Sequence, residues 1–418
     1  MTGRSLVLIE KTGIVGVIGL GYIGLPTAAI LADHGVRTIG MDVSERNVAA
    51  VNNGEVPFVE PGLREVLERA VNSGTLTATT QTPTADAYIV AVPTPFTDTH
   101  SADLSYIEAA ADGIATKLTG GELIILESTS PPGATEHMAA RILSARPDLT
   151  AEDILVAHCP ERVLPGKIMD EMITNDRIIG GLTRRAAEAA RDLYSAFCTG
   201  EFLLTDARTA EMAKLTENSF RDVNIAFANE LSVISHKLGI DVWELIELAN
   251  HHPRVNILQP GPGVGGHCIA VDPWFIVDAA PEQANLIRTA RQTNDAKPEW
   301  VLGRIEQALE AAGENPTVAL LGLAFKANID DLRESPSLRI AEKLAQRAPG
   351  AEILAVEPHV EELPRALQGF SNVALTSLDA ALAQADVVVL LVDHDDFKRV
   401  APEVLAGKTV IDTRGTWR

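Results

Sequence analysis

Two stretches of this chain alternate short runs of Val, Ile and Leu with helical, often Ala-rich segments. In the first stretch the apolar runs are VGVIGL, RTIGMD, AYIVAVP, ELIILEST and DILVAHCP. In the second they are TVALLGLAF, AEILAVEP, NVALTSL, DVVVLLVD and KTVIDTRG. Strands that alternate with helices are typical of a parallel sheet with helices on both faces. The sequence therefore predicts an α/β protein with two doubly wound domains.

A long amphipathic pattern separates the two stretches. From Thr209 to Leu238 apolar residues recur every three or four positions, and neither Gly nor Pro interrupts them. At 1.5 Å per residue the predicted helix is about 45 Å long, a length that usually links domains or builds a subunit interface. We expect an N-terminal extension over residues 1–12, a first α/β domain over 13–205, a central helical segment over 206–312 and a second α/β domain over 313–418.

Composition excludes several classes of protein. The chain has 57 acidic and 35 basic residues and a formal net charge of −22, which argues against nucleic acid as the main ligand. The uncharged stretch from Gly13 to Ala32 is too rich in glycine for a membrane helix. The chain has three cysteines, Cys159, Cys198 and Cys268, which are too scattered for a disulfide framework or a zinc site. We expect a cytoplasmic protein without a metal or a membrane partner.

A glycine-rich turn indicates the cofactor. The segment Gly19-Leu20-Gly21-Tyr22-Ile23-Gly24 follows a predicted strand and begins a predicted helix. Its first glycine permits a tight turn, its second lets the backbone approach a pyrophosphate, and its third allows close helix–strand packing. Asp42 ends the next strand, where a carboxylate can accept hydrogen bonds from ribose hydroxyls and would repel a 2′-phosphate. The pattern predicts a Rossmann-like site that prefers NAD, while Arg46 keeps NADP open.

Two later strand ends of the first domain supply further cofactor candidates. The carboxyl ends of the strands are where a doubly wound sheet binds its ligand. Hydroxyls there could reach the ribose phosphates or the nicotinamide, although ordinary turn chemistry would explain the same residue types. The predicted cofactor residues are Gly19, Gly21, Tyr22, Ile23, Gly24, Asp42, Arg46, Pro93, Thr94 and Thr129.

A second glycine-dense loop leads from Pro260 to Cys268. Glycine leaves backbone N–H groups accessible and gives a bulky ligand room. If a helix begins near Cys268, its dipole favours the thiolate, and Asp272 four residues later shares a face with the cysteine. This arrangement predicts a nucleophile with a nearby base or water-orienting group.

The long central helix carries two more polar candidates. Lys214 and Asn218 are four residues apart and lie off the apolar stripe. They could donate hydrogen bonds to a developing alkoxide, although a solvated helix face is the more ordinary interpretation.

At GLGYIGLP, EMAKLTENSFRDVNIAFANEL, GPGVGGHCIAVDPWF and GLAFKANIDDLRESPS the chain resembles the UDP-glucose/GDP-mannose dehydrogenase family. The resemblance implies a four-electron oxidation in which the C6 alcohol of a nucleotide sugar becomes a carboxylate while two NAD are reduced. Cys268 would capture the aldehyde as a thiohemiacetal and then carry a thioester that water hydrolyses. The resemblance also implies that Lys214 and Asn218 stabilise oxyanions, and that Asp272 and Glu161 handle proton transfer and orient water.

The resemblance further implies where the substrate binds. Lys326 would bind the nucleotide diphosphate, Arg414 would lie close to it, and Arg254 would reach the sugar site of a neighbouring subunit. The protein is then expected to be a homodimer with residues 206–312 as its dimerisation segment, although surface solubility would explain each arginine nearly as well. The implied substrate-binding residues are Glu161, Arg162, Val163, Lys214, Asn218, Arg254, His267, Lys326 and Arg414.

The Gly-Gly-His-Cys and Asp-Pro-Trp-Phe segments resemble the branch of this family that oxidises N-acetylhexosamine nucleotides. They imply UDP-N-acetyl-D-mannosamine as substrate, and a product used for a surface polysaccharide such as enterobacterial common antigen. UDP-GlcNAc, UDP-GalNAc and UDP-glucose remain alternative substrates. A two-electron β-hydroxyacid-type dehydrogenase, which needs no cysteine, and a non-catalytic NAD-binding protein are the alternative functions.

Overall fold

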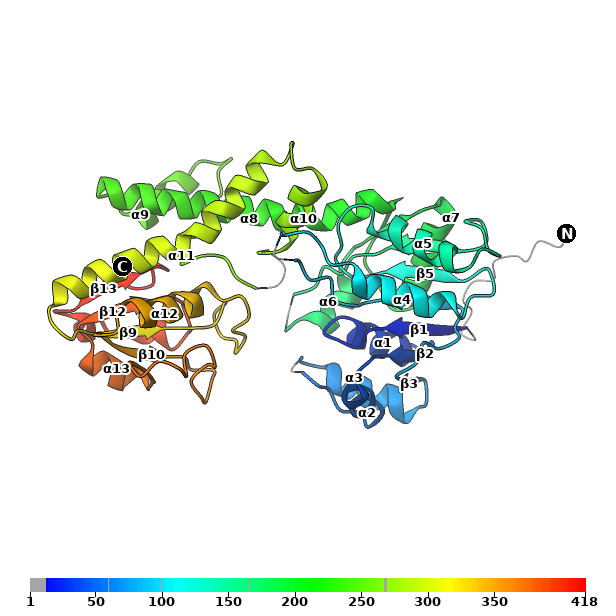
Figure 1. Cartoon of the computed structure of the whole chain (residues 1–418), viewed down its shortest axis with the longest axis horizontal. Helices are drawn as coiled ribbons and strands as arrows, with labels where there is room; N and C mark the ends of the chain where they lie inside the picture. Colours follow the sequence, from blue (N-terminus) through cyan, green and yellow to red (C-terminus); the bar gives the residue numbers. More distant parts are fainter. Residues whose placement is uncertain (1–12, 59, 98, 165, 267–268) are drawn as a thin grey trace. The chain divides into compact units, whose positions relative to one another are not determined.

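The computed structural model describes residues 13–58, 60–97, 99–164, 166–266 and 269–418. The chain divides into two compact units, one ending at Thr216 and the other running from Glu217 to Arg418. The boundary falls within α8 (Ala207–Leu238), the long helix that the apolar periodicity predicts (Figure 1). Within the described ranges, no helix is both long and apolar enough to cross a membrane.

The N-terminal unit is built on an eight-stranded sheet in the order β3-β2-β1-β4-β5-β6-β7-β8. Neighbouring strands run parallel, except that β6 and β7 pair antiparallel. The sequence predicts β1, β2, β4, β5 and β6, but it misses β3, β7 and β8, and it predicts no antiparallel pair. The strands are β1 (Ile14–Ile18), β2 (Arg37–Met41), β3 (Leu76–Thr79), β4 (Ala87–Val90), β5 (Leu123–Leu126), β6 (Leu155–His158), β7 (Arg177–Gly181) and β8 (Phe202–Asp206).

Helices cover both faces of this sheet. Val17, Ile89 and Ile125 belong to one apolar cluster, whereas Ile18 and Val90 belong to another, because successive side chains of a strand point to opposite faces. The first cluster includes residues of α1, α3, α6 and α7, and the second includes residues of α4 and α5. The helices are α1 (Gly24–Asp33), α2 (Glu45–Asn52), α3 (Leu63–Asn72), α4 (Ser105–Ala115), α5 (Ala134–Ala145), α6 (Ile168–Thr174) and α7 (Arg184–Tyr194).

A five-stranded sheet in the order β11-β10-β9-β12-β13 forms the second α/β layer, and all its pairs are parallel. These are the five strands predicted for the second domain, so the α/β class with two parallel-type sheets is confirmed. The strands are β9 (Thr317–Leu321), β10 (Glu352–Val356), β11 (Val373–Leu375), β12 (Val387–Leu390) and β13 (Thr409–Asp412).

The rest of the C-terminal unit is helical. The C-terminal half of α11 and the helix α12 belong to the apolar cluster on one face of the sheet. The helix α13 covers the other face. The elements are α9 (Val242–Asn250), α10 (Asp272–Ala279), α11 (Asn285–Ala312), α12 (Pro336–Arg347), α13 (Leu378–Gln384), the short 3₁₀ helix η1 (Phe397–Arg399) and α14 (Pro402–Leu405).

Candidate active site

The turn between β1 and α1 has the geometry that a dinucleotide site requires. Gly19 has φ +93°, a left-handed conformation, and a Cβ there would collide with the Ala91 carbonyl. A Cβ on Gly24 would collide with the Gly19 carbonyl, whereas one on Gly21 would meet nothing within 4 Å. No side chain caps the start of α1, where the helix dipole favours an anion. These residues fit the pyrophosphate of a dinucleotide.

Asp42 lies against this turn. Its Oδ2 accepts a hydrogen bond of 3.0 Å from the backbone N–H of Leu20, and its Oδ1 accepts one of 2.9 Å from Ser44. The carboxylate therefore braces the glycine turn from the end of β2. Arg46 is exposed on the first turn of α2, and the Tyr22 hydroxyl donates to Glu60 at 3.0 Å.

The ends of β4 and β5 are joined through a hydroxyl. Ser128 donates a hydrogen bond of 2.7 Å to the carbonyl of Val92. Pro93 is exposed, and the buried Thr94 hydroxyl has no hydrogen-bond partner among the described residues, while Thr129 is half-buried. Because β1, β2, β4 and β5 are parallel neighbours, their carboxyl ends meet at one edge of the sheet. The structure therefore brings the predicted cofactor residues from these strand ends to that edge.

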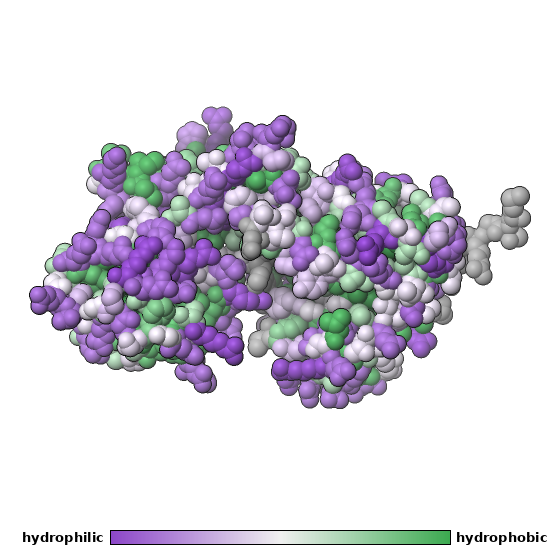
Figure 2. All heavy atoms as spheres, viewed as in Figure 1, coloured by the Kyte–Doolittle hydropathy of each residue, from purple (hydrophilic) through white to green (hydrophobic). Residues whose placement is uncertain are grey.

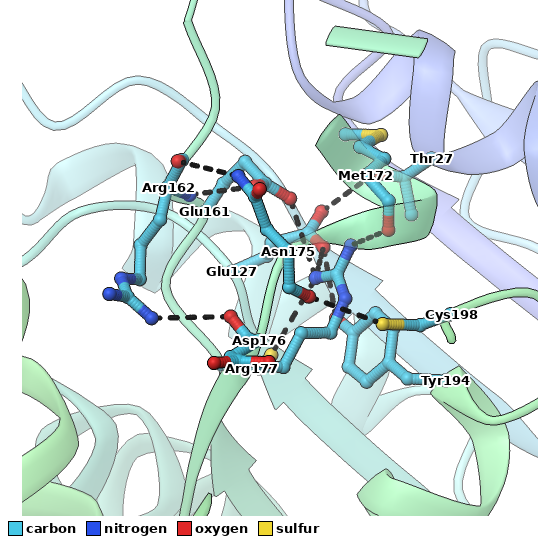
Figure 3. Close-up of polar contacts among 11 residues, drawn as sticks. Thr27, Glu127, Glu161, Arg162, Met172, Asn175, Asp176, Arg177, Tyr194 and Cys198 are labelled. Carbon is cyan, nitrogen blue, oxygen red and sulfur yellow. Dashed lines mark hydrogen bonds and ion pairs between the residues drawn. The ribbon is translucent and has the colours of Figure 1, made fainter. Parts of the chain in front are cut away.

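Glu161, in the loop after β6, belongs to a buried charged cluster at the same edge (Figure 3). Its Oε1 accepts a hydrogen bond of 2.6 Å from the backbone of Arg162, and its Oε2 lies 3.4 Å from the guanidinium of Arg177. Arg162 also donates from its guanidinium to the Asp176 carbonyl at 3.2 Å. Val163, the third predicted substrate residue here, packs against the apolar core.

Sequence reasoning missed Arg177 and Glu127 in this cluster. Arg177 is the first residue of the unpredicted strand β7, and Glu127 follows β5 within the quoted run ELIILEST. Sequence reasoning used only the hydroxyls at the end of that run, although a carboxylate directly after a buried strand is itself a signal of a functional site. Burial, and then the charge of Glu161, raise the pKa of Glu127 to about 7.

Neither described cysteine has the setting of a nucleophile. Cys159 is fully buried, and burial raises the pKa of its thiol to about 12. Cys198 is also buried, and its thiol donates to the carbonyl of Asn175 at 3.4 Å. Reactive cysteines are partly exposed thiolates, so these two thiols are expected to be inert.

Asn218 and Asp272 form a direct hydrogen bond inside the C-terminal unit. The Asn218 amide donates to Asp272 Oδ2 at 2.6 Å, and both residues are buried. Lys214 is half-buried four residues earlier on α8. The helix α10 begins at Asp272 rather than near Cys268, so the argument that both share a helical face does not apply. His267 and Cys268 themselves lie outside the described residues.

A polar network supports the glycine-dense loop on both sides of those two positions. The buried guanidinium of Arg291 pairs with Asp222 and donates to the carbonyl of Ile269 at 3.3 Å. On the other side, the carbonyl oxygen of the Asn229 side chain accepts a hydrogen bond of 2.9 Å from the backbone of Gly261. The network comes from α8 and α11. Sequence reasoning missed it because no local pattern shows which polar residues of two helices distant in the chain will meet.

The remaining substrate candidates lie in the C-terminal unit. Lys326 is exposed in the loop after β9, and Arg414 follows β13 and donates to Asp393 at 2.9 Å. Since β9, β12 and β13 are parallel neighbours, these two loops and Asp393 lie at the carboxyl edge of the second sheet. Arg254 is exposed in the turn after α9.

A cavity of about 260 Å³ in the same unit is lined by Trp243, Lys297, Trp300 and Asp412, among others. None of the predicted site residues within the described ranges lines it, so the cavity gives no support to the predicted substrate site. In the part of the chain that the structure describes, no group of three or more His, Cys, Asp or Glu side chains is arranged to hold a metal ion.

Comparison with known proteins accounts for nearly the whole chain. Residues 14–198 match the NAD binding domain of the UDP-glucose/GDP-mannose dehydrogenase family, residues 208–296 match its central domain, and residues 319–418 match its UDP binding domain. The chain is 57% identical to the NDP-N-acetyl-D-galactosaminuronic acid dehydrogenase of Ralstonia nicotianae, with 96% of each chain covered. It is 55% identical to the UDP-N-acetyl-D-mannosamine dehydrogenase of Salmonella typhi, covering 97% of this chain and 99% of that protein.

A solved structure shows the same fold. The UDP-N-acetyl-mannosamine dehydrogenase from S. aureus is 43% identical, covers 96% of this chain and 95% of its own, and superposes with a TM-score of 0.85. The matched domains identify NAD as the cofactor and a nucleotide sugar as the class of substrate, and they make this protein an NAD-dependent oxidoreductase. The chain belongs to the UDP-glucose/GDP-mannose dehydrogenase family.

Proposed function

We propose that the protein oxidises UDP-N-acetyl-D-mannosamine at C6 to UDP-N-acetyl-D-mannosaminuronate, with two NAD consumed per turnover. The observation that carries this proposal is the 55% identity to the Salmonella typhi enzyme over almost the full length of both proteins. The glycine turn at Gly19–Gly24 and the Asn218–Asp272 pair are features of this chain that suit the chemistry.

In the proposed mechanism Cys268 holds the reacting carbon, first as a thiohemiacetal and then as a thioester. Covalent capture keeps the aldehyde from diffusing away between the two oxidation steps. NAD, when bound, accepts the electrons of both steps. Lys214 donates a hydrogen bond to the C6 oxygen as negative charge develops there.

Asn218, Asp272 and Glu161 complete the proposed catalytic set. The Asn218 amide on α8 donates to Asp272 in the first turn of α10, and this bond fixes the orientation of both groups. Asp272 and Glu161 share proton transfer and orient the water that hydrolyses the thioester. In this proposal Lys326 and Arg414 bind the diphosphate, and Arg162, Val163 and His267 contribute to the sugar site.

The stoichiometry of NADH tests this mechanism. Purified protein given limiting UDP-N-acetyl-D-mannosamine should form two NADH per sugar without free aldehyde. Cys268→Ala should lower turnover by at least about 10³-fold, because the covalent step is lost. The matched control is Cys198→Ala, which removes a buried thiol outside the proposed site. One NADH per sugar with release of aldehyde would contradict the proposal and favour a two-electron dehydrogenase.

The 57% identity to the Ralstonia nicotianae protein favours a second candidate substrate, the galacto epimer. A panel of UDP-ManNAc, UDP-GalNAc, UDP-GlcNAc and UDP-glucose, compared by kcat/KM, decides between the epimers. The highest kcat/KM with UDP-ManNAc supports the proposal, and the highest with UDP-GalNAc replaces its substrate while keeping the reaction.

We further propose that the protein is a homodimer that buries one face of α8. Phe220, Phe227 and Leu238 are 68%, 54% and 63% exposed, and Leu248 on α9 is 64% exposed. Figure 2 shows apolar surface in the region of α9. Large exposed apolar side chains at helical spacing are typical of a subunit interface. In such a dimer Arg254 is proposed to reach the partner's site.

Sedimentation tests the proposed dimer. Phe227→Asp should convert a dimer into a monomer, whereas Val404→Asp, at a comparably exposed apolar position on α14, should leave the mass unchanged. A monomeric wild type would refute the proposal.

We also propose that the enzyme acts in the cytoplasm and supplies an acidic sugar for a surface polysaccharide such as enterobacterial common antigen. Cell fractionation, and the polysaccharide composition of a strain lacking the gene, test this role.

A further inference from the structure

One guanidinium in the N-terminal unit faces two carboxylates through the same nitrogen, Nη1 of Arg177. Arg177 is 3.4 Å from Glu161 and 3.9 Å from Glu127, and the side chains of these three residues are 5%, 9% and 0% exposed. Figure 3 draws Arg177 with Glu127 and Glu161 near its guanidinium. Burying three charged groups together is costly unless the arrangement is well satisfied, and here acids outnumber bases.

Glu127 is held from two helices in addition to Arg177. The Thr27 hydroxyl of α1 donates to its Oε2 at 3.0 Å, and the Tyr194 hydroxyl of α7 donates to its Oε1 at 2.9 Å. Thr27 lies three residues after Gly24, so the cluster connects the helix of the cofactor turn with the loop that carries Glu161. The guanidinium of Arg177 also lies 4.5 Å above the Tyr194 ring.

The opposite end of β5 shows that a buried glutamate needs no arginine in this sheet. Glu122 directly precedes β5, and Glu127 directly follows it. The Glu122 carboxylate is satisfied locally, since it accepts hydrogen bonds from the backbone of Thr119 and Gly120 and from the Thr119 hydroxyl. The fold can therefore satisfy a buried carboxylate here with local hydrogen bonds, so the cluster around Arg177 requires another explanation.

We propose that Arg177 and Glu127 are positioning residues for Glu161: Arg177 aims the Glu161 carboxylate, and the charge on Glu127 sets how much of the guanidinium's field remains for Glu161. The inference rests on the proposed function, in which Glu161 transfers a proton. When Glu127 is neutral, Arg177 acts on Glu161 alone. When Glu127 is ionised, the two carboxylates share the guanidinium, and Arg177 holds the Glu161 carboxylate less firmly.

This arrangement links the reaction to pH. Besides Thr27, the groups that face Glu127 are Arg177 on β7, Tyr194 on α7, and Cys159 and Glu161 after β6. Because the pKa of Glu127 is raised to about 7, its charge changes across the neutral range. Turnover should rise between pH 6 and 8 as Glu127 ionises and Arg177 leaves the Glu161 carboxylate freer to take part in proton transfer.

The test compares Glu127→Gln with the matched control Glu122→Gln at the other end of β5. Glu127→Gln fixes a neutral group, so it should lower kcat at pH 8 roughly tenfold and abolish the rise of kcat near pH 7. KM for the nucleotide sugar and NAD binding should stay within about twofold of the wild type, because Glu127 contacts neither ligand in this proposal. Glu122→Gln should keep the wild-type profile.

Two more substitutions keep the inference falsifiable if a variant folds poorly. Tyr194→Phe removes one hydrogen bond to ionised Glu127, so the rise of kcat should move upward by up to roughly one pH unit. Arg177→Lys keeps the charge and should retain more turnover than Arg177→Met. A wild-type profile in Glu127→Gln, or the same loss in Glu122→Gln, would overturn the inference.

Failure of this inference is distinguishable from failure of the proposed function. If the wild-type protein reduces no NAD with any UDP-sugar, the proposed function is wrong. If the wild type forms two NADH per sugar but Glu127→Gln retains the rise near pH 7, only the assignment of the positioning residues is wrong.

Discussion

Among the described residues, each of the two units buries one arginine, and the networks of these arginines end on different groups. In the N-terminal unit Arg177 faces Glu127 and Glu161, so its network ends on a carboxylate with a proposed role in proton transfer. In the C-terminal unit Arg291 pairs with Asp222 and donates to the carbonyl of Ile269, so its network ends on the backbone of a loop.

The difference shows how similar buried ion pairs serve different purposes. Asn294 extends the C-terminal network, because its amide donates to Asp222 and its oxygen accepts from Asn229, which in turn holds the backbone of Gly261. A network that ends on backbone atoms fixes the path of the chain. The N-terminal network also reaches the backbone, because Arg177 donates to the carbonyl of Met172 at 3.2 Å. Burial raises the pKa of Glu127 to about 7 and that of Asp222 only to about 6, so the N-terminal network is the one that changes charge near pH 7. We infer that the first network tunes a side chain and the second holds a loop.

The largest effect on this comparison is expected from Arg291→Met. The substitution leaves Asp222 buried without its cation, which should lower the free energy of unfolding of the C-terminal unit by about 3–5 kcal/mol. All four tryptophans of the chain, Trp243, Trp274, Trp300 and Trp417, lie in that unit, so urea unfolding followed by tryptophan emission reports on it. The control is the double variant Arg291→Met/Asp222→Leu, which should recover most of the lost free energy of unfolding. No recovery would show that the pair does not act as a unit.

A smaller effect, dependent on pH, is expected from Glu127→Gln. Burial raises the pKa of Glu127 from its ordinary value of 4.5 to about 7, so the folded state retains a proton that the unfolded chain releases. The stability that this group contributes is complete below pH 4.5 and is lost as pH rises through 7. Relative to the wild type, the free energy of unfolding of Glu127→Gln should therefore rise by roughly 3 kcal/mol between pH 4.5 and pH 8.

Hydrogen exchange of the β5 and β6 amides, measured by mass spectrometry, can follow this gain in the N-terminal unit. Glu122→Gln, which replaces a carboxylate held by backbone N–H groups, should show no such gain with rising pH. If Glu127→Gln and the wild type keep a constant difference across this range, Glu127 does not titrate near 7, and the contrast between the two networks fails.

The smallest effect is expected from Asn229→Ala, which cuts the C-terminal network where it meets the loop. The variant leaves the N–H of Gly261 and the side-chain oxygen of Asn294 without the partner that Asn229 supplies, at a cost of roughly 1–3 kcal/mol. Tryptophan emission in urea measures this cost, and proteolysis between residues 253 and 266 should become faster. Ser232→Ala on the same helix is the control, and equal proteolysis in both variants would contradict a role for Asn229 in holding the loop.

The sequence predicted much of the fold because the signals are local. Buried parallel strands are continuous apolar runs, so all five strands of the second sheet were recognisable. The turn at Gly19 was recognisable because its chemistry depends on the absence of Cβ atoms at fixed spacing. Strands β3 and β8 lie at the edges of the first sheet and are less buried, which weakens their apolar signal. Strand β7 begins with an arginine and ends with two glycines, so propensity argued against it.

That missed strand explains why the charged cluster was missed. Arg177 becomes a neighbour of Glu161 only because β7 runs antiparallel to β6 and so begins at the edge where β6 ends. No local pattern encodes this reversal. Residue spacing likewise does not reveal that a helix begins at Asp272. The hydrogen bond from Asn218 to Asp272 joins residues 54 positions apart, so no local pattern predicts it.

By itself the sequence determined the α/β class, the glycine turn and the family, because these depend on local propensity and on motifs of fixed spacing. Only the tertiary structure decided which buried groups meet: Glu127 with Thr27, Tyr194 and Arg177, and Arg291 with Asp222. Such pairs come from elements distant in the chain, and their pKa values depend on burial and on neighbouring charge, which exist only after folding. The physical reason is that a one-dimensional pattern specifies faces of helices and strands, whereas electrostatics depends on three-dimensional distance.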